Sequence, residues 1–583
     1  METINNTYPE PAEPGSRDRT PLIATCAVLI VLSCCCLLGA GLVVYLDPLD
    51  WNLIARLTGR YDAAAEAVPA DAGVYVGLDL LQLQSPEAER IFKAFAEAVP
   101  ESEFGGSEDV FNDLDEEMER DLGFTFTDDI LPWVGQHVGI GITDLQISPS
   151  GELESIDFIF AAAIRDRAAA EAFSAVLQDR IEAESGGTIQ PSDYEGTTIY
   201  ALPGDPGEGV AFAIHRGTFL FSTGAAEIRE SIDAKSGESF MDTEIFRDLA
   251  GQLPGDGLLH VFATPTLMEE VAESFSPGLV STSAFGGQVP FLGSAFSFAF
   301  VTAGIRIDTA TMYDPEAVPE FLQQVNDLRV QELTIDGRIP GNTLIFAGGR
   351  GLALTIDLLR EQMAADGGDT SFDESMAAFE SEFGFSLEND LLANLDGEYA
   401  LVVLPSRDGM LAAREVSLGV VLLFETSNPA GLTPVLAALE EIIARELVAP
   451  EQLEVNGAVV YQVGDPFLGE MFSYGVVENR FLVATSASLI RDLHADGPSL
   501  RVSETYQAVW GDFPNGTTPS FYFDVAGLIG SIREGMSSGD RADFDANLAG
   551  ALAPLRQIAM GTRSPSPELQ LTTLIAFIDG GTD

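Results

Sequence analysis

One stretch of this chain occurs twice, and the repetition constrains the fold more than any other feature. The segment from Asp121 to Ile140, DLGFTFTDDILPWVGQHVGI, returns 261 positions later as EFGFSLENDLLANLDGEYAL, from Glu382 to Leu401. The flanking segments recur in the same order, as expected when one structural unit has been duplicated. The 583 residues also exceed what one hydrophobic core usually organises. We therefore predict a tandem duplication, with a first repeat over residues 68–330 and a second over residues 331–583.

The spacing between matching positions changes little along the two repeats. Gly196 and Tyr200 match Gly457 and Tyr461, again 261 positions apart. Antiparallel hairpins dominate both repeats, as in residues 296–313, which alternate with period two. The sequence has no steady β-α-β-α order and no glycine-rich phosphate loop. This pattern favours an α+β fold over a doubly wound one. We predict that each repeat is an antiparallel-sheet domain with inserted helices.

The first repeat is expected to follow a short linker over residues 63–68 and then to contain more strands than helices. Strands are predicted over residues 73–80, 137–143, 156–164, 196–202, 209–215, 218–223, 258–264, 296–301 and 304–313. Helices are predicted after the capping residues Ser85 and Asp166, around Ile228 and Phe246, and over residues 316–326. The helix after Asp166 is expected to pack through one apolar stripe, formed by Phe173, Val176, Leu177 and Ile181.

Within the repeated motif, a short helix is expected to precede a strand. Thr127 or Asp128 is predicted to cap this helix, and Gly135 to end it. Asp129 and Asp390 occupy the same place in the two copies. A carboxylate at a helix start stabilises the first turn, whereas a general-acid role needs a second, differently tuned carboxylate nearby. We therefore predict a structural role for Asp129 and Asp390.

The N-terminal residues predict a membrane anchor. Residues 1–20 are polar and are expected to form a disordered cytoplasmic tail. Residues 21–46 contain no charge, and as a helix they would extend about 39 Å, enough to span a bilayer with some tilt. Arg17 and Arg19 precede this segment closely, which favours a cytoplasmic N-terminus and an extracytoplasmic body. Residues 47–67 are expected to form a juxtamembrane segment.

All four cysteines lie within the apolar run, at Cys26, Cys34, Cys35 and Cys36. The body therefore has neither intrachain disulfides nor thiolate metal sites. Val31 to Cys34 loosely resembles a bacterial lipobox, but the apolar run continues beyond it, which favours an uncleaved span over a lipoprotein signal or a cleaved signal peptide. Acylation of Cys34, Cys35 or Cys36 remains open.

The charge of the chain excludes one class of partner. The sequence contains 91 acidic and 29 basic residues, for a formal net charge of −62. Such a surface repels phosphate backbones, so nucleic acid is excluded as a partner. A saline habitat or a compositional bias of the genome would produce the same acidity, and the sequence does not separate these origins.

No catalytic signature is present. The histidines His137, His215, His260 and His494 stand apart in the sequence, without an HExxH motif or a paired spacing. No GxSxG elbow occurs, and the acidic stretches near Asp373 and Asp540 are expected to be solvated loops without ligand spacing. We assign no catalytic, cofactor-binding or metal-binding residue and expect no cofactor.

Two motifs resemble those of one bacterial family. VPADAGVYVGLDL at residues 68–80 and GFTFTDDILPWVGQHVGIGI at residues 123–142 are similar to the family known as domain of unknown function 3352. The resemblance extends from about Val68 to the end of the chain. It implies a short cytoplasmic tail, one membrane span and a large outer region, but no activity. Ala393 and Asn394 replace the Pro-Trp pair of the first motif in the second, which weakens a chemical role for that pair.

Two functions remain open. The first is a single-pass, membrane-anchored extracytoplasmic protein that serves the cell envelope as a non-catalytic binding or scaffold module. Its partners would be the lipid bilayer, through residues 21–46, and an envelope protein or polymer. The alternative is an envelope-polymer hydrolase with a carboxylate pair between the two repeats. The sparse distribution of catalytic residue types favours the first.

Overall fold

The structure is a computed structural model of the chain. It describes residues 62–98, 112, 115–120, 123–147, 153–202, 209–265, 291–316, 318, 323–324, 327–328, 331–354, 369–412, 416–465 and 469–579. These residues all belong to one compact unit, Val44–Asp583. The predicted transmembrane helix over 21–46 lies outside them, as does the predicted tail. Among the described residues, no helix combines the length and the apolar character needed to cross a membrane.

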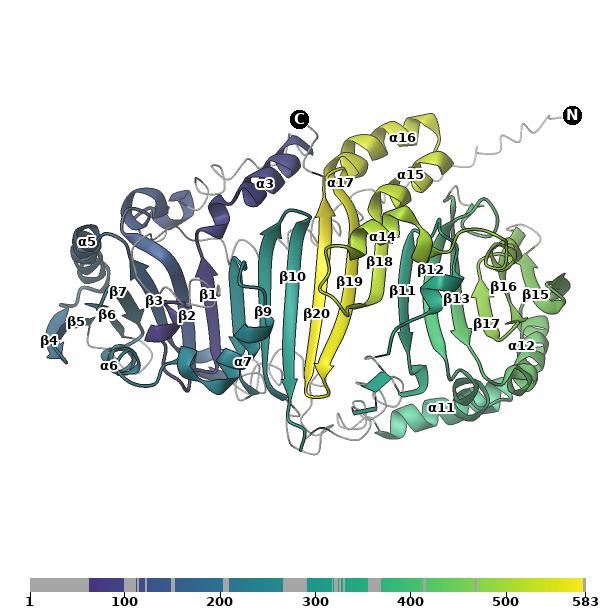
Figure 1. Ribbon diagram of the computed structural model, residues 1–583, viewed down its shortest axis with the longest axis horizontal. Coiled ribbons are helices and arrows are strands. Elements are labelled where there is room, and N and C mark those ends of the chain that lie inside the picture. The colour runs from purple at the N-terminus through teal and green to yellow at the C-terminus, as the bar shows by residue number, and fades with distance from the viewer. Residues whose placement is uncertain are drawn as a thin grey trace, which may run out of the picture. The chain divides into compact units, whose positions relative to one another are not determined.

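The first half of the body consists of strands β1–β10 and the helices between them. The strands are β1 Val74–Asp79, β2 Val134–Ile147, β3 Leu153–Ile164, β4 Gln190–Tyr194, β5 Thr197–Leu202, β6 Val210–His215, β7 Thr218–Ser222, β8 Leu259–Ala263, β9 Phe291–Val301 and β10 Gly304–Tyr313. The helices are α3 Pro86–Ala98, α5 Arg167–Ser185, α6 Ala225–Ala234 and α7 Glu244–Gln252. Neighbouring strands are antiparallel and lie in the order β4-β5-β6-β7-β3-β2-β1-β8-β9-β10 (Figure 1).

The second half consists of strands β11–β20 with their helices. The strands are β11 Ile345–Arg350, β12 Glu398–Pro405, β13 Leu418–Glu425, β14 Glu451–Val455, β15 Ala458–Asp465, β16 Gly469–Val477, β17 Arg480–Ala484, β18 Thr518–Asp524, β19 Leu555–Ser566 and β20 Leu569–Ile578. The helices are α11 Asp369–Phe383, α12 Thr433–Glu446, α13 Ala487–Asp492, α14 Glu504–Trp510, α15 Val525–Gly535, α16 Ser538–Phe544 and α17 Gly550–Leu552. The strand order is β14-β15-β16-β17-β13-β12-β11-β18-β19-β20, so the two halves arrange their strands in the same sequence of neighbours.

The two halves join through one pair of strands. β10 pairs with β20 in antiparallel register from Gly304 opposite Phe577 to Met312 opposite Leu569, which makes one continuous sheet of both halves. At the middle of this ladder Asp308 lies opposite Thr573, whose hydroxyl donates a hydrogen bond of 2.7 Å to the Asp308 carboxylate. Both side chains are buried. The fold is therefore α+β with a large antiparallel sheet, as predicted.

The two faces of this sheet differ in burial because successive side chains of a strand point to opposite sides. The core face is fully buried. In the first half it packs against α6 and α7 and includes Tyr75, Ala161, Leu220, Phe262, Ala295 and Ala310. In the second half it packs against α13 and α14 and includes Phe346, Val402, Val421, Leu482 and Tyr522. The opposite side, which we name the outer face, is mostly half-buried.

The predicted linker over residues 63–68 is part of the first core instead. Ala64, Ala65, Ala67 and Val68 are completely buried, and residues Ala65–Ala67 form a short 3-10 helix. Small apolar side chains lack the polarity of a linker and fit closely against the core face of the sheet. The first half therefore begins before the residue at which the sequence placed it.

The repeated motif folds into a capped helical turn in both halves. The turns are Phe126–Ile130 and Leu387–Leu391. Thr125 and Ser386 cap them, so the prediction of Thr127 or Asp128 as the cap was wrong by two or three positions. Asp129 and Asp390 accept the backbone N–H of these caps at 2.8 and 2.7 Å, which is the helix-start role predicted for them.

Trp133 and Asn394 make the same backbone hydrogen bond at matching positions. Trp133 Nε1 donates to the carbonyl of Asp129 at 2.8 Å, and Asn394 Nδ2 donates to the carbonyl of Asp390 at 2.8 Å. Trp133 also packs against Phe173, with ring centroids 5.3 Å apart. Trp133 is therefore a structural residue. In the second half Asn394 makes the equivalent hydrogen bond but does not replace the aromatic packing of the tryptophan.

Most other helix and strand predictions are confirmed, with some exceptions. Ser85 and Asp166 cap α3 and α5, but Val176, predicted in the apolar stripe of α5, is half exposed. The acidic segments near Asp373 and Asp540 are not loops, because they lie in α11 and α16. The edge strands β4 and β14 were not predicted. The predicted helix over 316–326 lies largely outside the described residues.

Replacing Trp133 tests its structural role. We expect Trp133→Ala to cost about 3–5 kcal/mol of local stability, because it removes both a large buried side chain and a hydrogen bond. The matched variant Asn394→Ala should cost only about 1 kcal/mol, since it removes mainly hydrogen bonds. Hydrogen exchange of the amides in the two helical turns measures both effects. Equal acceleration of exchange in the two variants would contradict this assignment.

Candidate functional site

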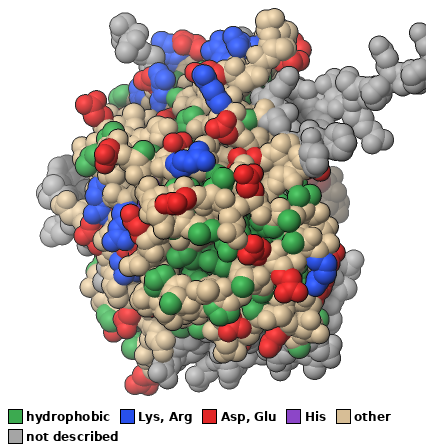
Figure 2. All heavy atoms as spheres, turned by 90° about the vertical axis from the view of Figure 1, so that its right-hand side faces the viewer, with side chains coloured by type: hydrophobic (Ala, Val, Ile, Leu, Met, Phe, Trp, Pro, Cys, Tyr) green, Lys and Arg blue, Asp and Glu red, His purple; other side chains and the backbone are tan. Residues whose placement is uncertain are grey.

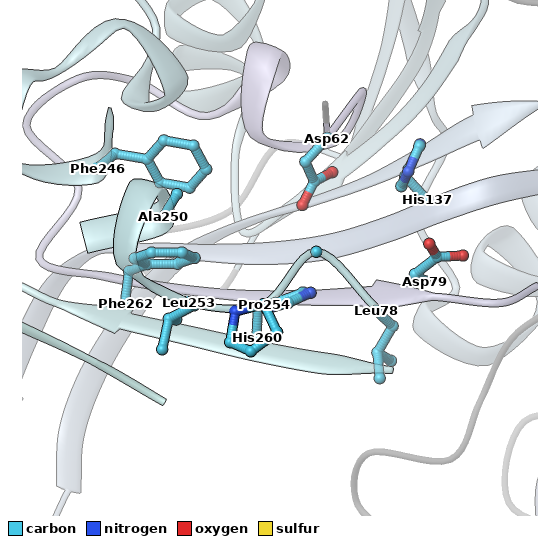
Figure 3. A pocket seen from close by; sticks show the side chains of 11 residues that line it. Asp62, Leu78, Asp79, His137, Phe246, Ala250, Leu253, Pro254, His260 and Phe262 are labelled. Carbon is cyan, nitrogen blue, oxygen red and sulfur yellow. The ribbon is translucent and has the colours of Figure 1, made fainter. Parts of the chain in front are cut away.

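The structure brings together polar side chains that are far apart in the sequence. Asp62, Asp79, His137 and His260 line a small pocket at the ends of β1, β2 and β8, next to Phe246 of α7 (Figure 3). Asp79 and His137 are direct cross-strand neighbours, and His260 lies opposite Gly77. The sequence showed these histidines only as separate residues, because the strand register that joins them is not visible in their spacing.

A hydrogen bond from Tyr75 to Asp62 ties the N-terminal segment of the body to the sheet. The Tyr75 hydroxyl donates to Asp62 Oδ2, and Asp62 Oδ1 accepts the N–H groups of Ala64 at 2.9 Å and Ala65 at 3.3 Å. Burial, followed by the charge of Asp62, raises the pKa of Tyr75 well above its usual value. The phenol therefore keeps its proton and remains the donor in this bond.

Two glycines make room for the Tyr75 ring. A Cβ atom at Gly77 would lie 2.8 Å from the Tyr75 hydroxyl oxygen, and one at Gly139 would lie 2.5 Å from it. Gly77 and Gly139 are cross-strand partners, so together they leave a hollow in the core face that the ring fills. Phe346 lies over Gly348 in the same way in the second half.

Burial shifts the pKa of two groups of the pocket in the direction of their neutral forms. It raises the pKa of Asp79, although His137 and the Gln136 amide, which donates to the Asp79 carboxylate at 3.1 Å, act in the opposite direction. Burial lowers the pKa of His260, against the attraction of Asp62 and Asp79. Ionisable groups with shifted pKa values occur in many active sites, but also in structural networks of buried polar residues.

The size of the pocket decides between these two interpretations. Its volume is about 50 Å³, enough for a few water molecules, whereas pockets for organic ligands usually measure about 300–1,000 Å³. Within the described parts of the chain, no three His, Cys, Asp or Glu side chains form a group that could hold a metal ion. The pocket therefore has no room for a substrate.

The matching place in the second half holds a partly buried ion pair. Arg350 lies opposite Glu398, as Asp79 lies opposite His137, and the two side chains form an ion pair. Glu398 also accepts the N–H of Thr334 at 2.9 Å, which ties the segment before β11 to the sheet. Different polar residues thus hold the incoming segment in each half. We conclude that the pocket around Asp62 is a structural connection.

A second hollow lies at the ends of β12, β13 and β17. Its volume is about 460 Å³, and its charged lining residues are Arg338, Asp396, Glu425, Glu478 and Arg480. Arg338 pairs with Glu425, and Arg480 pairs with Glu478 and lowers the pKa of that carboxyl. Ligand pockets of this size are usually mostly apolar. Here both arginines are already paired with carboxylates, and Asp396 accepts a hydrogen bond from the Ser427 backbone. We assign no ligand to this hollow.

The junction of the two halves was the place where the hydrolase alternative put a carboxylate pair. The guanidinium of Arg306 forms ion pairs with Asp256 and with Asp308 of β10. The distance from Arg306 Nε to Asp308 Oδ2 is 2.7 Å. A glycosidase requires one carboxyl group held as an acid and the other as a base. Two carboxylates that share one arginine do not form such a pair, so this junction provides no support for the alternative.

The other residues considered in the sequence have structural surroundings. His215 is buried, and its Nδ1 lies 2.6 Å from the Thr197 hydroxyl. His494 Nδ1 lies 2.7 Å from the carbonyl of Ile490 in α13. Neither histidine lines either of the two pockets described above.

The outer face of the sheet is the most unusual surface of the body. A row of cross-strand neighbours runs over it from β3 to β17, and every member is apolar: Ala162, Val138, Leu78, Leu259, Phe298, Ile307, Leu574, Met560, Phe521, Ala347, Leu401, Leu422 and Val483. Most of these side chains are half-buried, and Leu401 is 38% exposed. Ala162, Val138 and Phe298 are buried, whereas the other members leave apolar surface accessible, which soluble domains rarely do over so many strands.

Apolar side chains also reach the surface at the side of the second half that carries β15, β16 and α12. Figure 2 shows them gathered in a shallow hollow with charged side chains around it. Leu447 and Val448, just after α12, and Val459 of β15 are exposed large hydrophobic residues. Unlike the outer-face row, these positions belong to one half only.

The pKa of His260 predicts how stability depends on pH. Because burial lowers this pKa below 6.5, the unfolded chain binds a proton more readily than the folded chain. Stability should therefore be highest above about pH 6.5 and fall as the pH decreases. His215, whose pKa burial also lowers, contributes in the same direction. Melting temperatures measured between about pH 5 and 8 report this slope.

Substitution separates the contribution of His260 from the rest. His260→Gln should reduce the loss of stability on acidification. A slope in His260→Gln equal to that of the unaltered protein would refute the assignment.

Comparisons with known proteins place the chain in a family. Solved structures of TP0453 resemble part of this chain. The match with crystal form III covers 45% of this chain and 85% of the TP0453 chain, at 9% sequence identity and a TM-score of 0.24. The match with crystal form I covers 45% of this chain and 84% of the TP0453 chain, at 11% sequence identity and a TM-score of 0.23. A search of curated proteins found no match. The family model described as "Protein of unknown function (DUF3352)" matches residues 27–576, which confirms the resemblance seen in the sequence. The chain belongs to this family of proteins of unknown function, DUF3352.

Proposed function

We propose that this protein is a membrane-anchored, extracytoplasmic binding module without catalytic activity, and that the outer face of its sheet is the binding surface. The observation that carries this proposal is the row of apolar side chains from Ala162 of β3 to Val483 of β17, which contains no charged residue. The chain as a whole has 21% charged residues, so a surface free of charge across so many strands is a specific feature.

The polar sites of the body support a binding role over an enzymatic one. The pocket around Asp62 is too small for a substrate, and both arginines of the second hollow are paired with carboxylates. The carboxylates at the junction share Arg306. Catalysis needs groups placed to act on a substrate, whereas these groups hold the fold together.

The predicted anchor would keep the binding surface near a bilayer. The apolar segment 21–46 is long enough to span a membrane. The described structure begins at Asp62, so at most about 55 Å of extended chain separates the two. Residues 17 and 19 are arginines, which favours the body outside the cytoplasm.

We also propose that the two halves arose by tandem duplication of one unit. The same order of strand neighbours in both halves, the matching caps Thr125 and Ser386, and the matching glycines Gly77 and Gly348 support this origin. In addition, Asp308 and Thr573 lie 265 positions apart and face each other, as equivalent residues do on a two-fold axis. The junction would then descend from the interface of a symmetric dimer.

Labelling of single cysteines, in a chain whose Cys26, Cys34, Cys35 and Cys36 are replaced by alanine, tests the anchor and its orientation. Because the chain has no cysteine after Cys36, Ser192→Cys introduces a single thiol into the exposed edge strand β4. A membrane-impermeant maleimide added to intact cells should label this thiol. The control Glu10→Cys, in the predicted cytoplasmic tail, should be labelled only after the cells are permeabilised. Labelling of Glu10→Cys but not Ser192→Cys in intact cells would reverse the proposed orientation.

A further inference from the structure

The outer face is apolar over a much larger area than the single row described above. A parallel row crosses the second half and the junction through Val420, Val403, Ile345, Phe523, Ile558, Ala576, Ile305 and Phe300. Another crosses the first half through Phe221, Phe160, Ile140, Val76, Val261 and Phe296 and continues over the junction as Thr309, Thr572 and Thr562. The polar groups in these three rows are threonine hydroxyls, so the face offers neither charge nor many hydrogen-bonding side chains.

Helices occupy separate parts of this face. Phe173 of α5 packs on Phe219 of β7, with ring centroids 5.8 Å apart, and Ile443 of α12 packs with Tyr474 of β16. Phe92 of α3 contacts Phe300 of β9, with ring centroids 5.3 Å apart. Side chains between these helices remain accessible: Ile140 on β2 is 39% exposed and Leu401 on β12 is 38% exposed.

We name the accessible part of this face, which includes Ile140 and Leu401, the strip. α5, α3 and α12 project from this face beside the strip, which hinders its contact with a flat bilayer. Nine steps between neighbouring strands separate β2 from β12, which at about 4.8 Å per step amounts to roughly 43 Å. An acyl chain spans about 15 Å of the half-bilayer. Because α3 packs on Phe300 of β9 between the two positions, Ile140 and Leu401 mark two separate places for acyl chains on this face.

The chemistry of the strip favours hydrocarbon over protein. Protein interfaces have about one hydrogen bond per 100–200 Å² and usually a polar rim, and the backbone groups of these strands are already paired in the sheet. A second copy of the chain is disfavoured because two molecules with a net charge of −62 repel each other. Acyl chains need neither charge nor hydrogen bonds and gain free energy from apolar burial alone.

We propose that the outer face binds the acyl chains of individual phospholipid molecules in the strip that contains Ile140 and Leu401. This inference rests on the proposed function and names the ligand class of its binding surface. The lipid leaves the bilayer and lays its chains across the strands, while its headgroup stays in water. The segment before Asp62 keeps the strip within reach of the membrane from which the lipid comes.

Photolabelling of the full chain tests this proposal. The protein is reconstituted into phosphatidylcholine vesicles that contain a small fraction of phosphatidylcholine with a diazirine at the end of one acyl chain. After irradiation, mass spectrometry maps the labelled peptides. We expect label in peptides of β2 and β12 in addition to label in residues 21–46, which reports the anchor independently.

Substitutions of exposed residues give the test its specificity. Ile140→Glu combined with Leu401→Glu should reduce label in the strand peptides at least tenfold, because a carboxylate excludes hydrocarbon, and should leave label in residues 21–46 unchanged. The matched control Leu447→Glu replaces an apolar residue that is 56% exposed outside the strip, and should change neither signal. Ile140→Thr with Leu401→Thr keeps β propensity and should also reduce the label, which guards against a variant that misfolds.

Each other outcome overturns one specific claim. Label confined to residues 21–46 would leave the anchor intact and refute lipid binding by the outer face. Strand label without label in residues 21–46 would retain the lipid site and refute the anchor. Strand label that the Ile140 and Leu401 variants do not reduce would refute the location of the site. A dimer that dissociates on Ile140→Glu would assign the face to a second copy of the chain and overturn the proposal.

Discussion

The ladder between β10 and β20 is the interaction on which the rest of this structure depends. Its backbone hydrogen bonds join the two halves into one sheet, and they leave neither β10 nor β20 as an open edge. The hydroxyl of Thr573 and the guanidinium of Arg306 stabilise the buried carboxylate of Asp308 at the centre of the ladder. Because of this pairing, the apolar side chains of the two outer faces form uninterrupted rows instead of two separate patches.

The polar groups of the body are explained by the needs of this sheet. A sheet that buries one face must anchor the segments that lead into its central strands, and buried polar groups must find partners. Asp62 and Tyr75 do this before β1, and Glu398 with Arg350 does it before β11. The pKa shifts of Asp79 and His260 follow from their burial in this framework. Chemistry that looks functional in a pocket therefore has a structural explanation, while the function is better sought on the apolar face.

The sequence predicted the larger part of the fold because period-two alternation and capping residues act locally. The α+β architecture, most strands of the first half and the caps Ser85 and Asp166 could be predicted in this way. The edge strand β4 could not, since Pro191 and Asp193 in it have low strand propensity and are tolerated only at an edge. The segment 63–68 was predicted as a linker because alanine is common in linkers as well as in close packing, and only the tertiary structure distinguishes the two.

The candidate surfaces were harder to predict than the fold, because they depend on register between strands far apart in the chain. Asp79, His137 and His260 come from three strands, and no spacing in the sequence brings them together. The outer face is likewise formed only when β1, β8, β10 and β20 align, although each strand by itself shows an ordinary alternation of side chains. The sequence thus contained the pattern of each strand but not the surface that the strands form.

Oxidation of side chains by hydroxyl radicals tests most directly which face of the sheet is accessible. Mass spectrometry measures the extent of oxidation at each residue. The central claim is that one apolar face of the sheet is accessible while the other is buried. Met560 and Phe521 of the outer face should be oxidised readily, whereas Tyr75 and Tyr522 of the core face, which are 0% and 1% exposed, should be protected. Equal protection of both pairs of residues would contradict the account, because the apolar rows would then belong to a closed core.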